Sequence, residues 1–453
     1  MSNNPNKKTS SAGSKPATGY GVANARIESH DSRRAFLQKS LGFLGTMFIP
    51  GITFGGDDAY DDITVPSPVK SVIFFNMEGG MSHVDTLDHK TNMSPFSGAQ
   101  SSVNGITFAE SMQKTAKELH RIALIRSTWS EDGDHNFAQR LLHTGYRLPQ
   151  AQAFPDIPSL GAVIAYAKKS KATGSYFPAH VTMGRRAGLA GRGGFLGVKY
   201  SAFQVGNLDN PVTHLKPAVG RLSEDRLGRR GKVLDLLNDG FQKDFSSKEI
   251  DLWKQMFGAA REFAHSEQLD AFDLNKEKPE VRARFGQSWI GKACLMARRL
   301  AQAEVPFIEI GVGGWDTHKD NQSKVAQICK DMDPAIAALL GELGSSGLLK
   351  QTLVVFTSEF GRTPDVGGRD GRDHWPRVWS TLIGGGNIPG GIVVGESDAK
   401  GQKPAKRPVH VRELVATIYK AAGVDPEAHP VNSLGRPFPL VPRGTNVVSE
   451  LIS

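Results

Sequence analysis

Short, nearly continuous apolar runs alternate with helix-like stretches along most of this 453-residue chain, and this alternation limits the possible folds more than any other feature. The clearest runs are Val69–Met77, Arg121–Ser127, Val305–Val312 and Thr352–Thr357. Such runs are typical of strands that are covered on both faces of a parallel sheet. The alternation therefore predicts an α/β fold with a mostly parallel central sheet and helices on both faces.

The remaining expected elements come from shorter apolar runs and from apolar residues spaced three and four apart. A charged, helix-like stretch at about 220–301 is expected to be an insertion. The chain is longer than one ordinary domain, so one large domain with insertions and two domains are both open. The other strands are Ala179–Met183 and Thr381–Ile383, and the helices are Phe137–His143, Leu160–Lys168, Lys324–Leu343 and His410–Ala422.

The first 54 residues are interpreted as a tail followed by an export signal. Residues 1–30 contain too little apolar surface to fold, so we expect them to be disordered. Residues 31–54 contain Arg33-Arg34, a Phe-Leu pair and the apolar run Leu41–Ile49, and they resemble a twin-arginine signal. The alternative is a basic amphipathic helix on the folded body. Export by the twin-arginine machinery would bring the folded protein to the periplasm or the cell surface.

The charge of the chain argues against a nucleic-acid binder. The formal net charge is +9, but residues 1–40 carry seven Lys/Arg and two Asp/Glu and so contribute +5 of it. A nucleic-acid binder normally has a basic face with stacking aromatics, which this sequence lacks. The cysteines Cys294 and Cys329 have no CxxC spacing, so we expect two buried thiols or, in an oxidising compartment, a disulfide.

Acidic and histidine side chains recur in the loops after the predicted strands. Asp316 and His318 follow one strand, Glu359 follows the next, and His374 comes soon after. Ligands of parallel sheets lie beyond the carboxyl ends of strands, so these side chains are expected at one edge. Each alone could be a capping pair or a carboxylate paired with an arginine. Their recurrence instead predicts a site for a divalent metal, namely Zn, Mn, Fe or Ca.

Two earlier clusters add candidates to this site. Glu78 stands at the end of the first strand, with His83 and Asp85 soon after it, and all three are candidate ligands. The alternative for Asp85 is a helix N-cap. His135 lies at the expected N-terminus of a helix, where free backbone N–H groups favour an anion.

Five motifs in order resemble the domain-of-unknown-function 1501 family over roughly residues 66–445. That family is a divergent branch of the alkaline phosphatase and sulfatase superfamily, and its members often carry twin-arginine signals. The resemblance implies the superfamily fold, a metal-bearing sheet edge and hydrolysis of phosphate or sulfate esters. The motifs are MEGGxSHxDTLD, IRSxxxxxxDHN, GWDTH, SEFGRTP and GRDHWP.

The resemblance carries over to individual positions in part. Glu78 takes the place of the acidic ligand after the first strand, Asp316 and His318 resemble a later Asp and His, and His374 resembles a final His. At Glu359 the superfamily often has an Asp followed by a His, whereas a Phe follows here.

The largest departure concerns the nucleophile. His135 stands where sulfatases have a Cys or Ser, so it could be a metal ligand, a second-shell donor beside a metal-bound hydroxide, a nucleophile that forms a phosphohistidine, or purely structural. Ser127, Thr128 and Ser130 are weaker nucleophile candidates.

Arginines and tryptophans next to the motifs complete the candidate list. The guanidinium groups of Arg126, Arg362 and Arg372 match the geometry of phosphate or sulfate, or else pair with nearby carboxylates. Trp129, Trp315 and Trp375 either wall the pocket or pack in the core.

Two functions remain open. The first is an exported metal-dependent hydrolase acting on an anionic ester. The second is a non-catalytic metal-binding envelope protein that binds a polymer or a protein partner.

Overall fold

The structure, a computed structural model, describes residues 63–147, 157–168, 177–184, 191–212, 267–432 and 435–452, with isolated residues between 229 and 263. All of them belong to one compact unit, Gly51–Ser453. The predicted tail at 1–30 and the export signal at 31–54 lie outside the described residues, as do parts of the 220–301 stretch, including residues 241–262. None of the described helices is long and apolar enough to cross a membrane.

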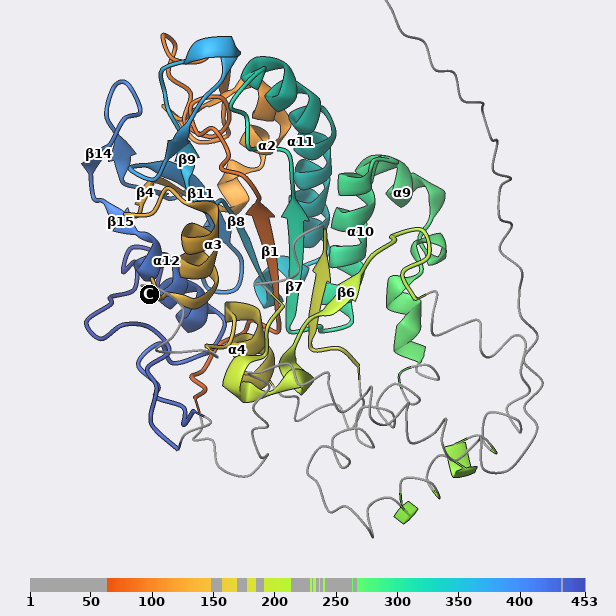
Figure 1. The fold of residues 1–453 in the computed structure, drawn as a ribbon. Coiled ribbons are helices and arrows are strands. Elements are labelled where there is room, and N and C mark those ends of the chain that lie inside the picture. The colour runs from red at the N-terminus through yellow and green to blue at the C-terminus, as the bar shows by residue number, and fades with distance from the viewer. Residues whose placement is uncertain are drawn as a thin grey trace, which may run out of the picture. The chain divides into compact units, whose positions relative to one another are not determined.

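The described chain contains a nine-stranded sheet in the order β12-β4-β11-β8-β1-β7-β5-β6, with β15 also paired to β4 (Figure 1). Only β11 runs antiparallel to its neighbours, β4 and β8. The predicted α/β fold with a mostly parallel sheet is therefore confirmed. The strands are β1 (Ser71–Met77), β4 (Ala123–Trp129), β5 (His180–Met183), β6 (Phe203–Val205), β7 (Phe307–Val312), β8 (Thr352–Thr357), β11 (Trp379–Gly384), β12 (Val393–Val394) and β15 (Val409–His410).

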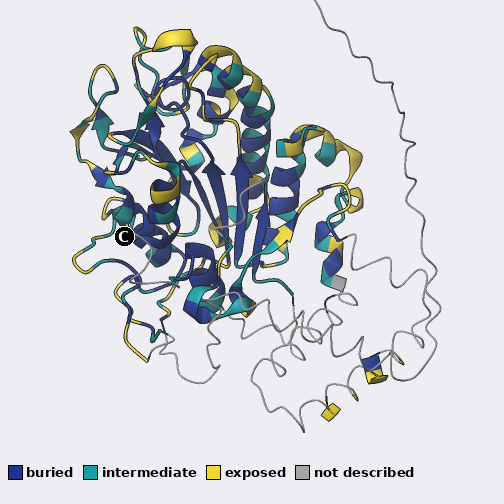
Figure 2. Ribbon diagram, in the orientation of Figure 1, coloured by how far each residue is buried: buried dark blue, intermediate teal, exposed yellow. Residues whose placement is uncertain are grey.

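Helices cover both faces of the sheet, which explains why its central strands β1, β7 and β8 are buried at every position (Figure 2). Along β1, Ile73 and Phe75 pack in the cluster under α2 (Gln113–Lys117), α10 (Trp289–Gln302) and α11 (Asn321–Ser345). Val72 and Phe74 pack in the opposite cluster under α3 (His135–Thr144), α4 (Leu160–Ala167) and α12 (Val411–Ala421). Cys294 and Cys329 are both free thiols and buried on the first face.

The long predicted elements match observed ones with shifts of a few residues at their ends. The short elements were missed, because a two- or three-residue strand leaves no periodic pattern. They are β2 (Gly98–Gln100), β3 (Thr107–Ala109), β9 (Gly361–Arg362), β10 (His374–Trp375), β13 (Glu396–Ser397) and β14 (Pro404–Lys406), together with β6, β12, β15 and α2. The helices α9 (Pro279–Phe285) and α10 fall in the stretch that was predicted to be helical.

Candidate metal centre

The candidate centre lies at the carboxyl ends of β7 and β8, beside the first turn of α3 and strand β10. Two glycines after β7 lead to Asp316 and His318, and β8 leads to Glu359. His135 is the first residue of α3, and His374 begins β10. The predicted edge of the sheet therefore brings together side chains from four separate parts of the chain.

A glycine after β1 fixes where the Asp316 backbone lies. Gly79 has a φ of +112°, and a Cβ at this position would lie 2.4 Å from the backbone nitrogen of Asp316. Its own N–H donates to Glu359 Oε1 over 2.8 Å. Only glycine permits both this backbone conformation and this approach, so the β1 loop sets the spacing between the β7 and β8 loops.

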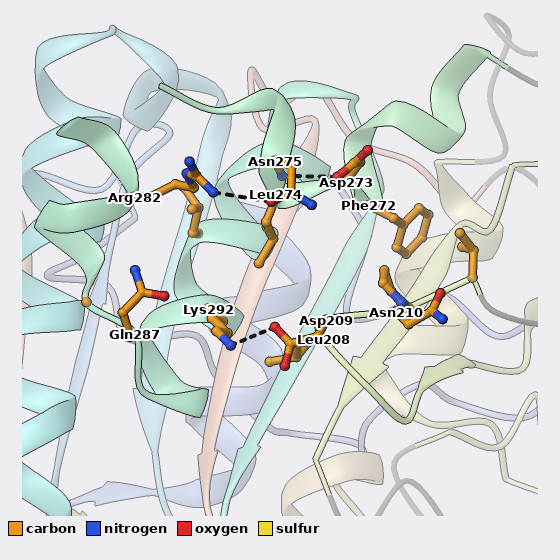
Figure 3. A pocket seen from close by; sticks show the side chains of 14 residues that line it. Leu208, Asp209, Asn210, Phe272, Asp273, Leu274, Asn275, Arg282, Gln287 and Lys292 are labelled. Atoms are coloured by element: carbon orange, nitrogen blue, oxygen red, sulfur yellow. Dashed lines mark hydrogen bonds and ion pairs between the residues drawn. The ribbon is translucent and has the colours of Figure 1, made fainter. Parts of the chain in front are cut away.

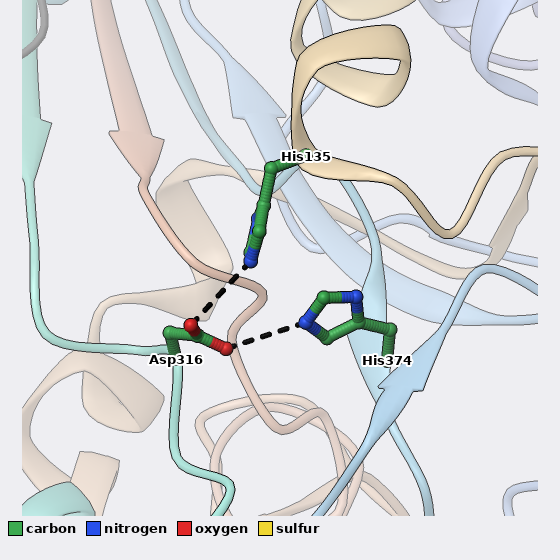
Figure 4. Close-up of side chains that lie close together, drawn as sticks. All are labelled: His135, Asp316 and His374. Carbon is green, nitrogen blue, oxygen red and sulfur yellow. Dashed lines mark hydrogen bonds and ion pairs between the residues drawn. The ribbon is translucent and has the colours of Figure 1, made fainter.

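Three imidazoles face one carboxylate at the centre. His374 Nε2 lies 3.3 Å and His318 Nε2 3.1 Å from Asp316 Oδ1, while His135 Nε2 lies 3.5 Å from Asp316 Oδ2. The Nε2 atoms of His318 and His374 are 3.0 Å apart. Figure 4 shows His135 and His374 each directed at a different oxygen of Asp316, and these three residues each offer a ligand atom within 4.8 Å of the others.

Each of the three imidazoles is held from behind through its Nδ1 atom. A carbonyl accepts only, and an ionised carboxylate does the same, so in the neutral form of each ring Nδ1 carries the hydrogen and Nε2 presents its lone pair toward the centre. The Nδ1 contacts are His135 to Glu359 Oε1 at 3.0 Å, His374 to Gly133 O at 2.6 Å and His318 to Asp373 Oδ1 at 2.8 Å.

This arrangement fits a divalent cation. Metal-binding histidines usually donate their other ring N–H to a carboxylate or a carbonyl, as all three do here. Ligands of a tetrahedral zinc ion with bonds of about 2.0 Å lie about 3.3 Å apart, close to the contacts at Asp316. Without a cation or an extra proton, His318 and His374 would point two lone pairs at each other. The buried Glu359 Oε2 atom also has no hydrogen-bond partner.

Arg362 holds the Asp316 carboxylate in its ionised form. Burial opposes ionisation of Asp316, but the hydrogen bond and charge of Arg362 outweigh it and lower the pKa of Asp316 to about 2. Arg362 itself is fully buried and donates to the backbone oxygens of Gly79, Gly80 and Arg372. The N–H groups of Arg362 are thus directed at other parts of the protein. Arg362 therefore does not present a donor to solvent, as the predicted role of clamping a substrate would require.

The protonation of the centre depends on which acceptors face each ring. Burial lowers the pKa of His374, which favours the neutral, ligating form. The hydrogen bond to Glu359 raises the pKa of His135, and the charge of Asp316 adds to it. A cation at this centre would therefore compete with a proton on His135, so its binding would weaken as the pH falls.

Phe360 occupies the position directly after Glu359, where the resemblance led us to expect an imidazole. The ring is fully buried and lies against His374, with ring centroids 4.6 Å apart, and against His135 at 5.0 Å. The aromatic ring packs against both imidazoles, whose own centroids lie 4.4 Å apart. The centre therefore has an apolar wall at this position.

Glu78 lies directly after β1 and is buried. Its carboxylate packs against Gly311 of β7, where a Cβ would come within 2.6 Å of Oε1. The sequence placed it correctly at the strand end, and the structure puts it on the β7 side of the sheet edge.

The predicted ligands His83 and Asp85 are held elsewhere, which corrects their assignment. Both are fully buried. Asp85 forms a bidentate ion pair with Arg372, over 2.8 and 3.0 Å, and His83 Nε2 donates to Gly401 O over 2.8 Å. The position of His83 and Asp85 soon after the first strand could not reveal these partners, which lie about 300 residues away in the sequence.

The other candidates also point away from the centre. Arg126 pairs with Asp88 at 3.5 Å. Ser127 Oγ donates to Arg407 O, and Thr128 Oγ1 contacts Thr381 Oγ1. Ser130 is buried, so none of the three hydroxyls is placed as a nucleophile at the centre. Trp315 is buried in the core, Trp129 packs edge-on against His410, and Trp375 donates to Gln402 O.

Sequence reasoning missed Asp373 and the Gly133 carbonyl, which hold His318 and His374 from behind. Asp373 directly precedes His374 in the GRDHWP motif, so its position next to a ligand was an available signal. The carbonyl of Gly133 left no signal, because any residue supplies one.

A separate hollow lies beyond the end of β6 (Figure 3). It is lined by the loop after β6, by the segment at 272–275 and by parts of α9 and α10. Lys292 pairs there with Asp209 at 2.6 Å, and Arg282 donates to Asn275 at 3.2 Å. None of the predicted site residues lines it.

The family of the chain follows from its sequence. The family described as "Protein of unknown function (DUF1501)" matches residues 69–452. The chain belongs to this family. The predicted resemblance is thereby confirmed, and no curated protein matches the sequence.

Solved structures with a related arrangement include members of the alkaline phosphatase and sulfatase group. A sulfatase from Pseudoalteromonas sp. is 12% identical, with 88% of this chain and 72% of that chain covered and a TM-score of 0.34. A protein in the alkaline phosphatase superfamily from Vibrio parahaemolyticus is 10% identical (84% and 73% covered, TM-score 0.37). The C-terminal periplasmic domain of EcEptC from Escherichia coli, in complex with Zn, is 9% identical (83% and 87% covered, TM-score 0.37). Such low values carry no conclusion about activity.

Proposed function

We propose that this protein is an exported, metal-dependent hydrolase of phosphate or sulfate esters. The observation that carries the proposal is the convergence of three imidazole Nε2 atoms and one carboxylate at the carboxyl edge of the sheet. The resemblance of the motifs to the alkaline phosphatase and sulfatase superfamily supports the reaction class, and Arg33-Arg34 supports export by the twin-arginine route.

His135, Asp316 and His374 would hold the cation, with His318 Nε2 in reach as a fourth donor. Three imidazoles favour Zn²⁺, Mn²⁺ or Fe over Ca²⁺, which prefers oxygen ligands. A bound divalent cation would supply Lewis acidity toward the ester oxygens and make water more acidic. Glu359, Asp373 and the Gly133 carbonyl orient the rings.

Water is the attacking group in this proposal. The described hydroxyls of Ser127, Thr128 and Ser130 make contacts away from the centre, and His135 is directed at Asp316. Water would add to phosphorus or sulfur, the ester alcohol would leave, and no covalent enzyme intermediate would form. The cation would meet the substrate charge, because Arg362 and Arg372 are already paired within the protein.

A second candidate is a non-catalytic metal-binding envelope protein that binds a polymer or a protein. Phe360 favours it, because this ring replaces a possible ligand and leaves fewer donors for a second cation.

Hydrolysis assays separate the two functions. The purified full chain, loaded in turn with Zn²⁺, Mn²⁺ or Fe²⁺, is tested on a phosphomonoester, a phosphodiester and a sulfate ester. Turnover that disappears in an Asp316→Ala/His318→Ala variant supports the hydrolase. A loaded wild type that is inactive on all three classes would contradict it and favour the binding protein.

A further inference from the structure

A buried ion pair joins helix α3 to the middle of the sheet. Glu309 lies in β7 and is 3% exposed, and His143 lies in the last turn of α3 and is 1% exposed. The His143 Nε2 and Glu309 Oε1 atoms are 3.0 Å apart. The same face of the sheet is otherwise packed with apolar side chains such as Phe74 and Phe307. A buried ion pair is often no more stable than the apolar contacts that could replace it, so this one calls for another role.

The pair holds a proton. His143 Nδ1 faces the carbonyl oxygen of Gln139 at 2.8 Å, so that nitrogen carries a hydrogen, while Nε2 faces a carboxylate. One further proton must therefore lie between His143 and Glu309. Burial would lower the pKa of His143, but the charge and hydrogen bond of Glu309 outweigh it and raise that pKa.

A second contact joins the same helix face to the next strand. Asn76 of β1 and Gln139 of α3 exchange amide hydrogen bonds of 2.9 and 3.3 Å. His135, Gln139 and His143 are four residues apart in turn, so they lie along one face of α3.

These three residues contact three adjacent strands. His135 reaches Glu359 after β8, Gln139 reaches Asn76 in β1, and His143 reaches Glu309 in β7. The strand order β8-β1-β7 is continuous in the sheet. The row of polar contacts therefore fixes both the rotation of α3 and its position along its axis.

We propose that Glu309 and Asn76 are positioning residues, which hold α3 through His143 and Gln139 so that His135 Nε2 faces Asp316. This inference rests on the proposed cation centre. It assigns a function to a buried charge that neither the family pattern nor the centre itself requires.

The test compares Glu309→Gln with a matched buried carboxylate on the opposite face. Asp333 is 4% exposed and accepts from Thr115 N and Lys114 N, so Asp333→Asn loses a similar buried charge far from α3. For the full-length variants, Mn²⁺ affinity is measured by titration of the metal-free protein, and backbone exposure by hydrogen exchange. Glu309→Gln is expected to weaken Mn²⁺ binding about tenfold, the lower end of the loss seen when a group that holds a metal ligand is changed, and to speed exchange in α3 but not in α11. Asp333→Asn should leave the Mn²⁺ affinity and the exchange in α3 unchanged.

A double variant guards against a simple folding defect. Glu309→Gln/His143→Gln replaces the ion pair by a neutral amide pair of similar reach, and it should recover Mn²⁺ affinity to within about threefold of the wild type. If Glu309→Gln has the Mn²⁺ affinity and the α3 exchange of Asp333→Asn, or if the double variant folds without recovery, the proposal is overturned. A wild type that binds no Mn²⁺, Zn²⁺ or Fe²⁺ would overturn the proposed function, while α3 exchange would still decide whether Glu309 positions the helix.

Discussion

Two groups of polar side chains near the sheet edge each contain an aspartate but differ in how their polar atoms are used. The open centre consists of His135, His318, His374 and Asp316, and the Asp316 side chain is 50% exposed. The sealed pair, Asp85 and Arg372, is fully buried. Both groups were candidates from the sequence, and only their surroundings tell them apart.

The sealed pair is saturated with partners. Arg372 donates to both oxygens of Asp85 and to the carbonyls of Thr363, Pro364 and Met93. Asp85 also accepts from Ser82 Oγ over 2.7 Å and from Asn321 Nδ2 over 2.8 Å. Nothing is left to bind a ligand, so the pair acts within the structure.

The open centre has the opposite pattern. The Nδ1 atoms of the imidazoles are hydrogen-bonded to the protein, while their Nε2 atoms converge on Asp316. The Nε2 atoms of His318 and His374 face each other directly. A charged pair whose hydrogen-bonding groups all have protein partners therefore indicates a structural role. Imidazole Nε2 atoms that converge on one carboxylate indicate a binding role. The following changes test that difference, from the largest expected effect to the smallest.

Breaking the sealed pair should cost the most stability. Arg372→Met leaves the Asp85 carboxylate buried without its partner, and we expect the free energy of unfolding to fall by about 3–5 kcal/mol. Urea denaturation of the full chain measures this, and cation affinity of the folded fraction should be unchanged. A loss below about 1 kcal/mol would mean that the pair is not structural.

Removing the central carboxylate should have the opposite profile. Asp316→Asn is expected to weaken Mn²⁺ or Zn²⁺ binding at least about 100-fold, or about 2.7 kcal/mol, because every imidazole of the centre faces this group. Asp320→Asn, an exposed change four residues later, is the control. Equal affinities in the two variants would place the cation elsewhere.

Changing the acceptor behind His135 should have a moderate effect. Glu359→Gln keeps the size of the side chain but removes its charge, and the loss of cation affinity should be about tenfold. The same change should lower the pKa of His135, since its hydrogen bond to Glu359 is the main cause of the raised value. Titration of the His135 ring by NMR in the metal-free protein checks this, and an unchanged pKa contradicts it.

The smallest expected effect concerns the buried His180 and the dependence of stability on pH. His180 donates Nδ1–H to Tyr200 O, as His374 does to Gly133 O, but burial lowers the pKa of His180 to about 4. The unfolded chain would take up a proton at His180 near pH 6.5, so this residue should reduce stability as the pH falls from about 6.5 to about 4.

His180→Leu should remove part of that acid sensitivity. The unfolding free energy of the wild type should fall by at least about 1 kcal/mol more than that of His180→Leu between pH 6.5 and pH 4.5. Urea denaturation at several pH values measures the difference, and parallel pH profiles would contradict it.

The sheet and its covering helices could be predicted because apolar periodicity is local in the sequence. The strand-end position of Asp316 and Glu359 followed from the same reasoning. The pairing of Asp85 with Arg372 could not, since the two residues are separated by 287 positions. His135 was ambiguous for a related reason: its role depends on Glu359 and Asp316, which reach it only in the folded sheet. Glu309 was read as part of an apolar strand, and its partner His143 on α3 is 166 positions away in the sequence.

The central claim is that the open centre holds a divalent cation, and metal analysis tests it most directly. The full chain is purified, exposed to Zn²⁺, Mn²⁺ or Fe²⁺, dialysed and analysed by mass spectrometry, beside an Asp316→Ala/His318→Ala variant. We predict about one tightly bound cation per wild-type chain and none in the variant. A folded wild type without bound metal, or a variant that retains it, would contradict the account.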